Sequence, residues 1–250
     1  MIFRQLIEPD SSTYSYLISC PDTGQTAIID PVLDTVERDL EVLQSLGLRL
    51  DFTIDTHVHA DHLTGASALK SRVGSKICFP AVDELACADI GLKEGETFRL
   101  GNIEIHPLFT PGHTNHHHGY LIHTPVHNML FSGDALMIDG VGRTDFQSGD
   151  SATLYNSIQQ KYFTLPDDTL VYPCHDYTDR RISTIAQEKI RNQHIGGGKS
   201  LQEFSKIMDE MELPYPRKID FAVPGNERCG QCPDNIPEEY RGPCDKFDQG

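Results

Sequence analysis

Residues 56–65 read THVHADHLTG and follow an apolar run at residues 52–54 that is typical of a strand. Four metal-competent side chains lie in this stretch: His57, His59, Asp61 and His62. Because alternate residues of an extended chain share a side, the first two histidines point together, and a turn after them brings back the other two side chains. The stretch therefore predicts a metal site at the end of a strand, and the alternative is a solvated polar loop.

The size and charge of the chain narrow the class of protein. It has 250 residues, of which 38% are hydrophobic, and we expect one packed domain over residues 1–250. No stretch approaches the roughly 18 apolar residues that cross a bilayer, and we expect no leader segment and a cytoplasmic location. The net charge of −16 argues against nucleic acid and anionic membranes as partners, because both attract clustered Lys and Arg.

The seven cysteines lie at positions 20, 78, 87, 174, 229, 232 and 244. An odd number without framework spacing favours free thiols in a reducing compartment. Cys229 and Cys232 with Cys244 suggest zinc, but a closed site needs a fourth ligand and none lies nearby in the sequence. We therefore predict free cysteines.

Turn residues and hydrophobic periodicity predict alternating strands and helices. The expected strands span residues 3–7, 14–19, 25–29, 52–56, 76–80, 97–100, 103–108, 120–123 and 128–132. The first expected helix begins with a capping pair, Asp34 with Glu37, and stops at Gly47; the others span residues 63–73, 151–162, 182–192 and 201–211. Two strand-rich halves with covering helices indicate an α/β fold, an αββα sandwich of two sheets with helices outside.

Three later metal-competent side chains lie in turns directly after apolar strands. They are His113 in TPGHT, Asp134 in FSGD and His175 in VYPCHDY. Taken singly, each has an equally good structural explanation. His113 is then a turn histidine, Asp134 a helix cap, and His175 a loop residue bonded to Asp176. With the first cluster they give seven candidate ligands, all imidazole or carboxylate, which suits zinc, iron or manganese better than copper(I) or an iron–sulfur cluster.

The motifs THVHADH, TPGHT, SGDAL and CHDY, in this order, resemble the metallo-β-lactamase superfamily, whose fold is the αββα sandwich. The resemblance covers nearly the whole chain. Two further segments are more specific: GRTDFQ at residues 142–147, and IDFAVPGN with Arg-Cys-Gly at residues 219–230. Both are similar to the persulfide dioxygenase branch of that superfamily.

The persulfide dioxygenase resemblance implies one Fe(II) per chain, bound by His57, His113 and Asp134. Such a two-histidine, one-carboxylate triad leaves about three positions for a substrate sulfur and dioxygen, and zinc cannot supply electrons to oxygen. The implied reaction converts glutathione persulfide, dioxygen and water to glutathione and sulfite. Four other side chains then hold water and orient the ligands without binding iron: His59, Asp61, His62 and His175.

Two residues are candidates for contact with the substrate. Arg143 has two equally supported interpretations. It either attracts or positions the acidic glutathione, or it is an ordinary loop arginine that pairs with Asp145 or Asp150. Tyr177 resembles a family position near the substrate, where its hydroxyl would bond the ligand. For Cys229 we favour a structural role over thiol exchange with persulfides.

Some segments depart from the family pattern. Small or acidic residues usually follow TPGHT, but three histidines stand at positions 116–118; we favour ordinary loop residues over a proton shuttle or adventitious metal binding. Asn192-Gln193-His194 replaces Asn-Pro-Arg, which removes an arginine expected near the substrate. The Pro- and Asp-rich tail at residues 232–250 extends past the resemblance and receives no role.

Two other functions remain open. The seven ligands also suit a glyoxalase II-like hydrolase, in which two zinc ions bridged by Asp134 generate a hydroxide that attacks a thioester. GRTDFQ and the short ending argue against it, because that resemblance implies a longer helical substrate domain. A non-catalytic metal-binding protein is disfavoured by the complete ligand set. A homodimer is compatible with the resemblance.

Overall fold

The computed structural model describes residues 1–177, 179–234 and 236–247, so parts of the tail at positions 235 and 248–250 lie outside the described residues. The chain divides into two compact units. Unit 1 comprises Met1–Leu92, Leu100–Ile103 and Tyr215–Gly250, and unit 2 comprises Lys93–Arg99 and Glu104–Pro214. Whether the two form one domain, as the sequence suggests, stays a prediction.

Unit 1 contains a six-stranded sheet in the order β1-β2-β3-β4-β5-β6. Its strands are β1 (Ile2–Glu8), β2 (Thr13–Ser19), β3 (Thr26–Ile29), β4 (Phe52–Ile54), β5 (Lys76–Pro80) and β6 (Ile90–Leu92). The first three form an antiparallel meander, and β3 to β6 run parallel. Parallel strands place their carboxyl ends at one edge, so the segments that follow β3 and β4 begin side by side.

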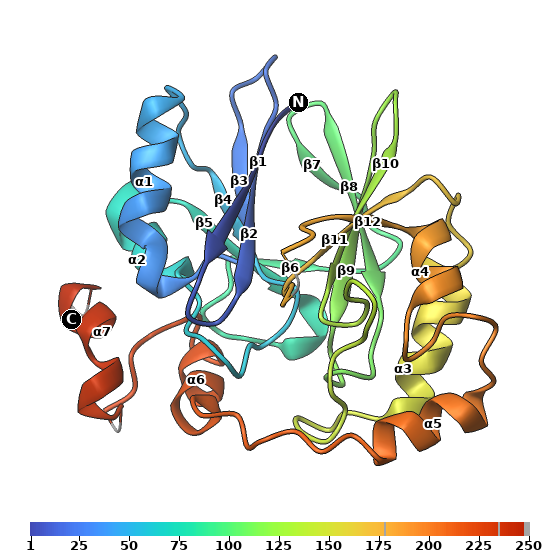
Figure 1. Cartoon of the computed structure of the whole chain (residues 1–250). Helices are drawn as coiled ribbons and strands as arrows, with labels where there is room; N and C mark the ends of the chain where they lie inside the picture. The colour runs from blue at the N-terminus through green and yellow to red at the C-terminus, as the bar shows by residue number, and fades with distance from the viewer. Residues whose placement is uncertain (178, 235, 248–250) are drawn as a thin grey trace. The chain divides into compact units, whose positions relative to one another are not determined.

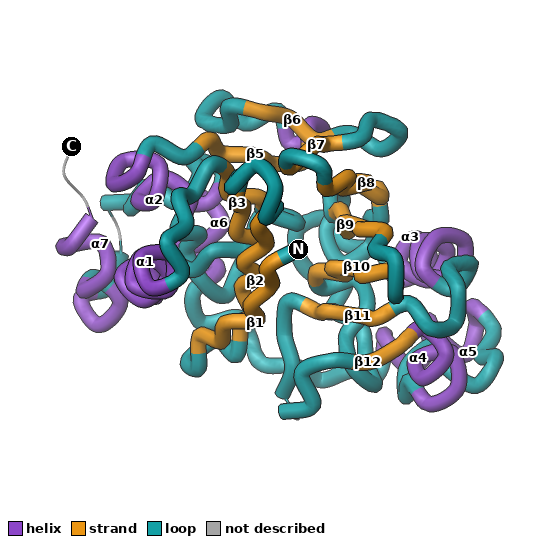
Figure 2. The backbone as a smooth tube through the Cα atoms, turned by 90° about the horizontal axis from the view of Figure 1, so that it is seen from above, coloured by secondary structure: helices purple, strands orange, loops and turns teal. Residues whose placement is uncertain are grey.

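Helices cover one face of this sheet (Figures 1 and 2). The helical elements of unit 1 are η1 (Leu33–Thr35), α1 (Val36–Ser45), α2 (Ala66–Val73), η2 (Ala81–Asp83), α6 (Ile219–Asn226), η4 (Glu238–Tyr240) and α7 (Gly242–Phe247). Their apolar side chains join the buried strand residues in one core that includes Leu17, Leu69 and Phe221. Ile236 and Cys244 belong to the same core, so the described part of the tail is packed against unit 1.

The prediction that Asp34 and Glu37 form a capping pair is wrong. Asp34 lies inside the 3-10 turn η1, and α1 begins at Val36 with Thr35 as an N-cap whose side chain makes no capping hydrogen bond. The end of the helix follows the expectation: Gly47 has φ +64°, and the N–H of Leu48 donates to the carbonyl of Leu43 at 2.9 Å.

The second six-stranded sheet, in the order β12-β11-β10-β9-β8-β7, lies in unit 2 except for Leu100 and Ile103, which belong to unit 1. Its strands are β7 (Phe98–Leu100), β8 (Ile103–Phe109), β9 (His118–His123), β10 (Asn128–Gly133), β11 (Leu170–Pro173) and β12 (Ser183–Thr184). The parallel pair β10 and β11 ends immediately before Asp134 and Cys174. The turns after these two strands therefore start at the same edge of the sheet.

The helices of unit 2 lie on one side of its strands (Figure 2). They are α3 (Ser151–Ser157), the π-helical turn η3 (Ile158–Tyr162), α4 (Ile185–Arg191) and α5 (Leu201–Asp209). The helix expected over residues 182–192 is shorter, because Ser183 pairs in β12 and the Thr184 hydroxyl caps α4 by accepting the N–H of Gln187. Within the described chain, no helix is long and apolar enough to cross a membrane.

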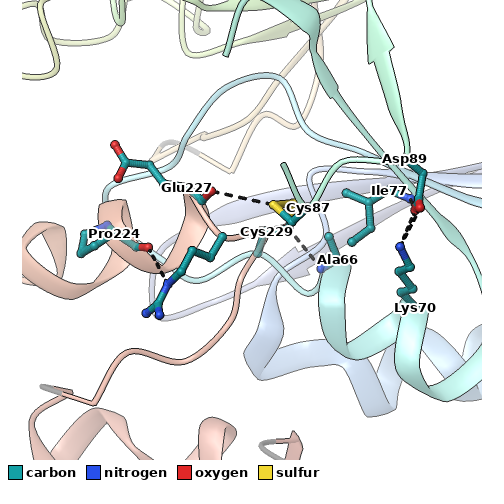
Figure 3. The surroundings of a disulfide bond; sticks show 10 residues. Ala66, Lys70, Ile77, Cys87, Asp89, Pro224, Glu227 and Cys229 are labelled. Carbon is teal, nitrogen blue, oxygen red and sulfur yellow. Dashed lines mark hydrogen bonds and ion pairs between the residues drawn. A yellow bond between two sulfur atoms is a disulfide. The ribbon is translucent and has the colours of Figure 1, made fainter. Parts of the chain in front are cut away.

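The prediction of free cysteines is wrong for four of the seven. Disulfides join Cys87 to Cys229 (Figure 3) and Cys232 to Cys244. The first pair is separated by 142 residues, so the spacing of the cysteines along the chain gives no sign of it. Disulfides are uncommon in reducing compartments, and the cysteine argument for a cytoplasmic location therefore weakens.

Candidate metal centre

In unit 1, the metal-competent side chains after β4 lie together. The ring centroids of His57 and His59 are 4.1 Å apart, and those of His59 and His62 are 4.3 Å apart. Ligand atoms of His59, Asp61 and His62 lie within 4.8 Å of one another. The three histidines are at most 1% exposed, so this cluster is not the solvated loop of the alternative interpretation.

Buried carboxylates hold the middle histidine. His59 Nε2 lies 3.1 Å from Asp30 Oδ1 and 3.7 Å from Asp55 Oδ1. Burial lowers the pKa of His59, but the hydrogen bond to Asp30 and the charges of Asp30 and Asp55 outweigh it and raise that pKa to about 9. His59 Nδ1 is buried and has no hydrogen-bond partner among the described residues. An imidazole with one nitrogen on a carboxylate and the other unsatisfied suits a bound metal or its water.

The main chain of this loop is fixed by Asn226, at the end of α6. Its amide Nδ2 donates to the carbonyls of His59 at 2.9 Å and His62 at 2.8 Å, and its Oδ1 accepts the N–H of Thr64 at 2.8 Å. Asn226 is fully buried. Nearby, a Cβ on Gly230, which has φ +84°, would lie 2.0 Å from the carbonyl oxygen of Thr64. The segment at residues 219–230 therefore anchors the loop that carries the histidines.

In unit 2, the three later candidates also lie together. Asp134 Oδ2 is 3.5 Å from His113 Nε2 and 3.6 Å from His175 Nε2, and all three side chains are largely buried. Ligands with metal bonds of about 2.0–2.2 Å in a tetrahedral arrangement are about 3.4 Å apart. The donor atoms and their spacing therefore fit one metal ion or two that share Asp134.

The tautomer of His113 is set by its surroundings. Its Nδ1 lies 2.7 Å from the carbonyl oxygen of Arg143, which can only accept, so Nδ1 carries the proton and Nε2 keeps its lone pair. Gly142 N donates to the carbonyl of Asp134 at 2.8 Å. A Cβ on Gly142 would lie 2.4 Å from that carbonyl oxygen and 2.7 Å from His113 Nδ1, which explains why glycine opens the GRTDFQ segment.

The two candidates for substrate contact, Arg143 and Tyr177, have different surroundings. Arg143 donates from Nε and Nη2 to Asp145 at 2.6 and 2.7 Å and from Nη1 to the carbonyl of Pro214 at 2.9 Å. It therefore forms the ion pair with Asp145 that was one of the two expected roles. This hydrogen bonding lowers the pKa of Asp145. Tyr177 is 74% exposed, and its ring stacks on His175 with centroids 6.0 Å apart. A role for either residue in substrate binding stays a prediction.

Sequence reasoning missed several residues of these clusters. Asp30 and Asp55 follow β3 and β4 directly, and Cys174 follows β11 and places its sulfur within 4.8 Å of ligand atoms of Asp134 and His175. The rule that identified the other candidates, a metal-competent residue after an apolar strand, would have found all three. No such signal exists for Asn226, whose partners lie 162 to 167 residues away.

We expect Asn226→Leu to lose divalent metal. Leucine leaves two carbonyls and one N–H of the loop unsatisfied, at about 1–3 kcal/mol each, and displaced supports of metal ligands typically cost about 10–100-fold in affinity. Metal titration and urea unfolding measure the two effects. The matched control is Asn102→Leu, at an exposed amide that bonds Asp22, which should change neither value. Unaltered metal affinity in Asn226→Leu would contradict the anchoring role.

Comparisons with known proteins agree with these features. Residues 9–175 match the family model of the Metallo-beta-lactamase superfamily. The chain is 42% identical to the mitochondrial persulfide dioxygenase ETHE1 of Homo sapiens over 92% of this chain and 89% of that protein. It is 38% identical to a hydroxyacylglutathione hydrolase of Polaromonas sp., over 70% of this chain and 66% of that protein.

A crystal structure of ETHE1 from Myxococcus xanthus superposes with a TM-score of 0.88 at 46% identity, over 92% of this chain and 100% of that one. The expected α/β fold class of the metallo-β-lactamase type is thereby confirmed. The chain belongs to the metallo-β-lactamase superfamily and, within it, to the persulfide dioxygenase branch.

Proposed function

We infer that this persulfide dioxygenase oxidises glutathione persulfide with dioxygen and water to glutathione and sulfite, at one Fe(II) bound by His57, His113 and Asp134. The observation that carries the inference is the similarity to persulfide dioxygenases over nearly their whole length. The THVHADH, TPGHT and SGDAL motifs supply one of these ligands each.

The donor set supports a ferrous ion. Two imidazoles and one carboxylate are borderline and hard donors, and they leave positions open for further ligands. When bound, iron would donate electrons to oxygen, which zinc cannot do. The hydrogen bond from His113 Nδ1 to the carbonyl of Arg143 leaves the lone pair on Nε2 for the metal. The hydrogen bond from Gly142 N to the carbonyl of Asp134 holds the main chain of the third ligand.

The remaining polar side chains act on water and on ligand orientation in this proposal. His62 Nδ1 lies 3.1 Å from Asp61 Oδ2 and 3.4 Å from the Thr13 hydroxyl, so its ring is held on one side. His59 is held through Nε2 by Asp30. Together with Asp61 and His175, these residues would hold water and pass protons without replacing the three ligands.

A binuclear zinc thioester hydrolase remains the second candidate. The position of Asp134 Oδ2, nearly equidistant from His113 Nε2 and His175 Nε2, suits a carboxylate that bridges two ions. The lower identity and coverage of the hydroxyacylglutathione hydrolase favour the oxygenase instead.

The proposed partners are glutathione persulfide and dioxygen, with neither nucleic acid nor membrane, since the net charge is −16. A homodimer stays a prediction. We keep the cytoplasm as the predicted location, although the human relative is named as mitochondrial and two disulfides are unusual in a reducing compartment.

Metal content and oxygen uptake test the reaction. Protein produced with both iron and zinc available should hold one iron per chain and consume oxygen when glutathione persulfide is added. Removal of the iron by a chelator should stop oxygen uptake, and Fe(II) should restore it. Two zinc ions per chain with thioester hydrolysis and no oxygen uptake would favour the second candidate.

The division between ligands and supporting residues is tested by His113→Ala and Asp61→Asn. Loss of His113 removes a proposed ligand, so iron retention should be abolished, whereas Asp61→Asn should keep iron and turn over more slowly. His127→Ala, at an exposed histidine, is the matched control. Equal loss of iron from His113→Ala and Asp61→Asn would contradict the proposed ligand set.

A further inference from the structure

The three consecutive histidines at residues 116–118 have different surroundings. His116 is half-buried, and His118 is 1% exposed with its Nδ1 3.0 Å from the carbonyl of His116 and its ring 5.2 Å from that of Phe109. His117 is fully buried, and its Nε2 lies 3.1 Å from the main-chain N of Asp134. His117 is therefore bonded to the main chain of a proposed iron ligand.

We propose that His117 is a positioning residue that fixes Asp134 by accepting its main-chain N–H. The inference rests on the proposed function, because it takes Asp134 to bind the metal. At this position the chain departs from the family pattern, and the sequence suggests only loop, proton-shuttle or adventitious-metal roles for the three histidines.

The polarity of the bond fixes the tautomer of His117. A main-chain N–H can only donate, so Nε2 of His117 accepts and carries no proton. Nδ1 then carries the proton and donates to the Thr110 hydroxyl at 3.0 Å. An additional proton on Nε2 would face the N–H of Asp134, and the bond would be lost. The lone pair of Nε2 is thus used by the N–H of Asp134 and is not free to bind a metal, and an amide N–H passes no proton on through the ring.

The hydrogen-bonded chain continues beyond Thr110. The Thr110 hydroxyl is 3.0 Å from the Tyr162 hydroxyl, which lies 3.3 Å from the carbonyl of Ser132. Thr110, His117, Ser132 and Tyr162 are all 0% exposed. Because water does not reach these groups, loss of one partner leaves another unsatisfied.

This network closes around the turn that carries Asp134. It begins at the N–H of Asp134 and ends at the carbonyl of Ser132, and Gly133 between them has φ +54°. On the other side, Gly142 N donates to the carbonyl of Asp134. Both main-chain groups of Asp134 are therefore held, and its carboxylate starts from a fixed backbone.

The first measurement is the tautomer of His117, by 15N NMR of the imidazoles in metal-free protein. We expect the proton on Nδ1 and an unprotonated Nε2. The second is the affinity for Fe(II) alone, titrated without oxygen into the wild type, His117→Leu, His117→Gln and His118→Leu. Leucine fills the space but accepts nothing, and affinity should fall about 10–100-fold. Glutamine can accept and donate, so it should restore most of the loss, and His118→Leu should match the wild type.

Thr110→Val provides a gentler variant should His117→Leu not fold, since it removes only the partner of Nδ1. It should weaken iron binding less than His117→Leu. A proton on Nε2, or wild-type iron affinity in both His117→Leu and Thr110→Val, would overturn the inference. A wild type that binds no iron would instead contradict the proposed function, and the tautomer in metal-free protein would still decide whether His117 holds Asp134.

Discussion

Hydrogen bonds to the main chain of the ligand loops are the interaction on which the proposed site depends. In unit 1 the Asn226 amide holds the carbonyls of His59 and His62, and in unit 2 Gly142 N holds the carbonyl of Asp134. Loops after strands are otherwise free to move, and a displaced ligand loses affinity for its metal. The segments at residues 142–147 and 219–230, which resemble persulfide dioxygenases, supply both anchors, so we expect them to act on the site through its backbone.

The electrostatics of unit 1 also suit a cation. Asp30 and Asp55 are buried beside His59, and burial raises the pKa of Asp55 to about 8. Burying carboxylates costs free energy unless a positive charge or hydrogen bonds compensate. Asp30 accepts the main-chain N–H of Thr56 and contacts His59. A bound metal ion would offset the remaining cost and would lower the pKa of carboxylates near it.

The sequence predicts what depends on local pattern. His57 and His59 lie together as expected, although β4 ends at Ile54 and both stand in the loop after it, and the left-handed glycine at Gly47 ends α1 as expected. The sequence pattern does not predict α6, because Pro224 and Gly225 lie within that helix and lower its helix propensity. It also misses contacts that are distant along the chain, such as the pairing of Cys87 with Cys229. The burial of His117 could not be predicted either, because it depends on packing against residues that are distant along the chain, such as Asp134.

The most direct test of the proposed ligand set is X-ray absorption at the iron edge of protein loaded with Fe(II). Two imidazole nitrogens and carboxylate or water oxygens at about 2.0–2.2 Å are expected. A sulfur ligand at about 2.3 Å would contradict this set, because the nearby thiol of Cys174 would then bind the metal.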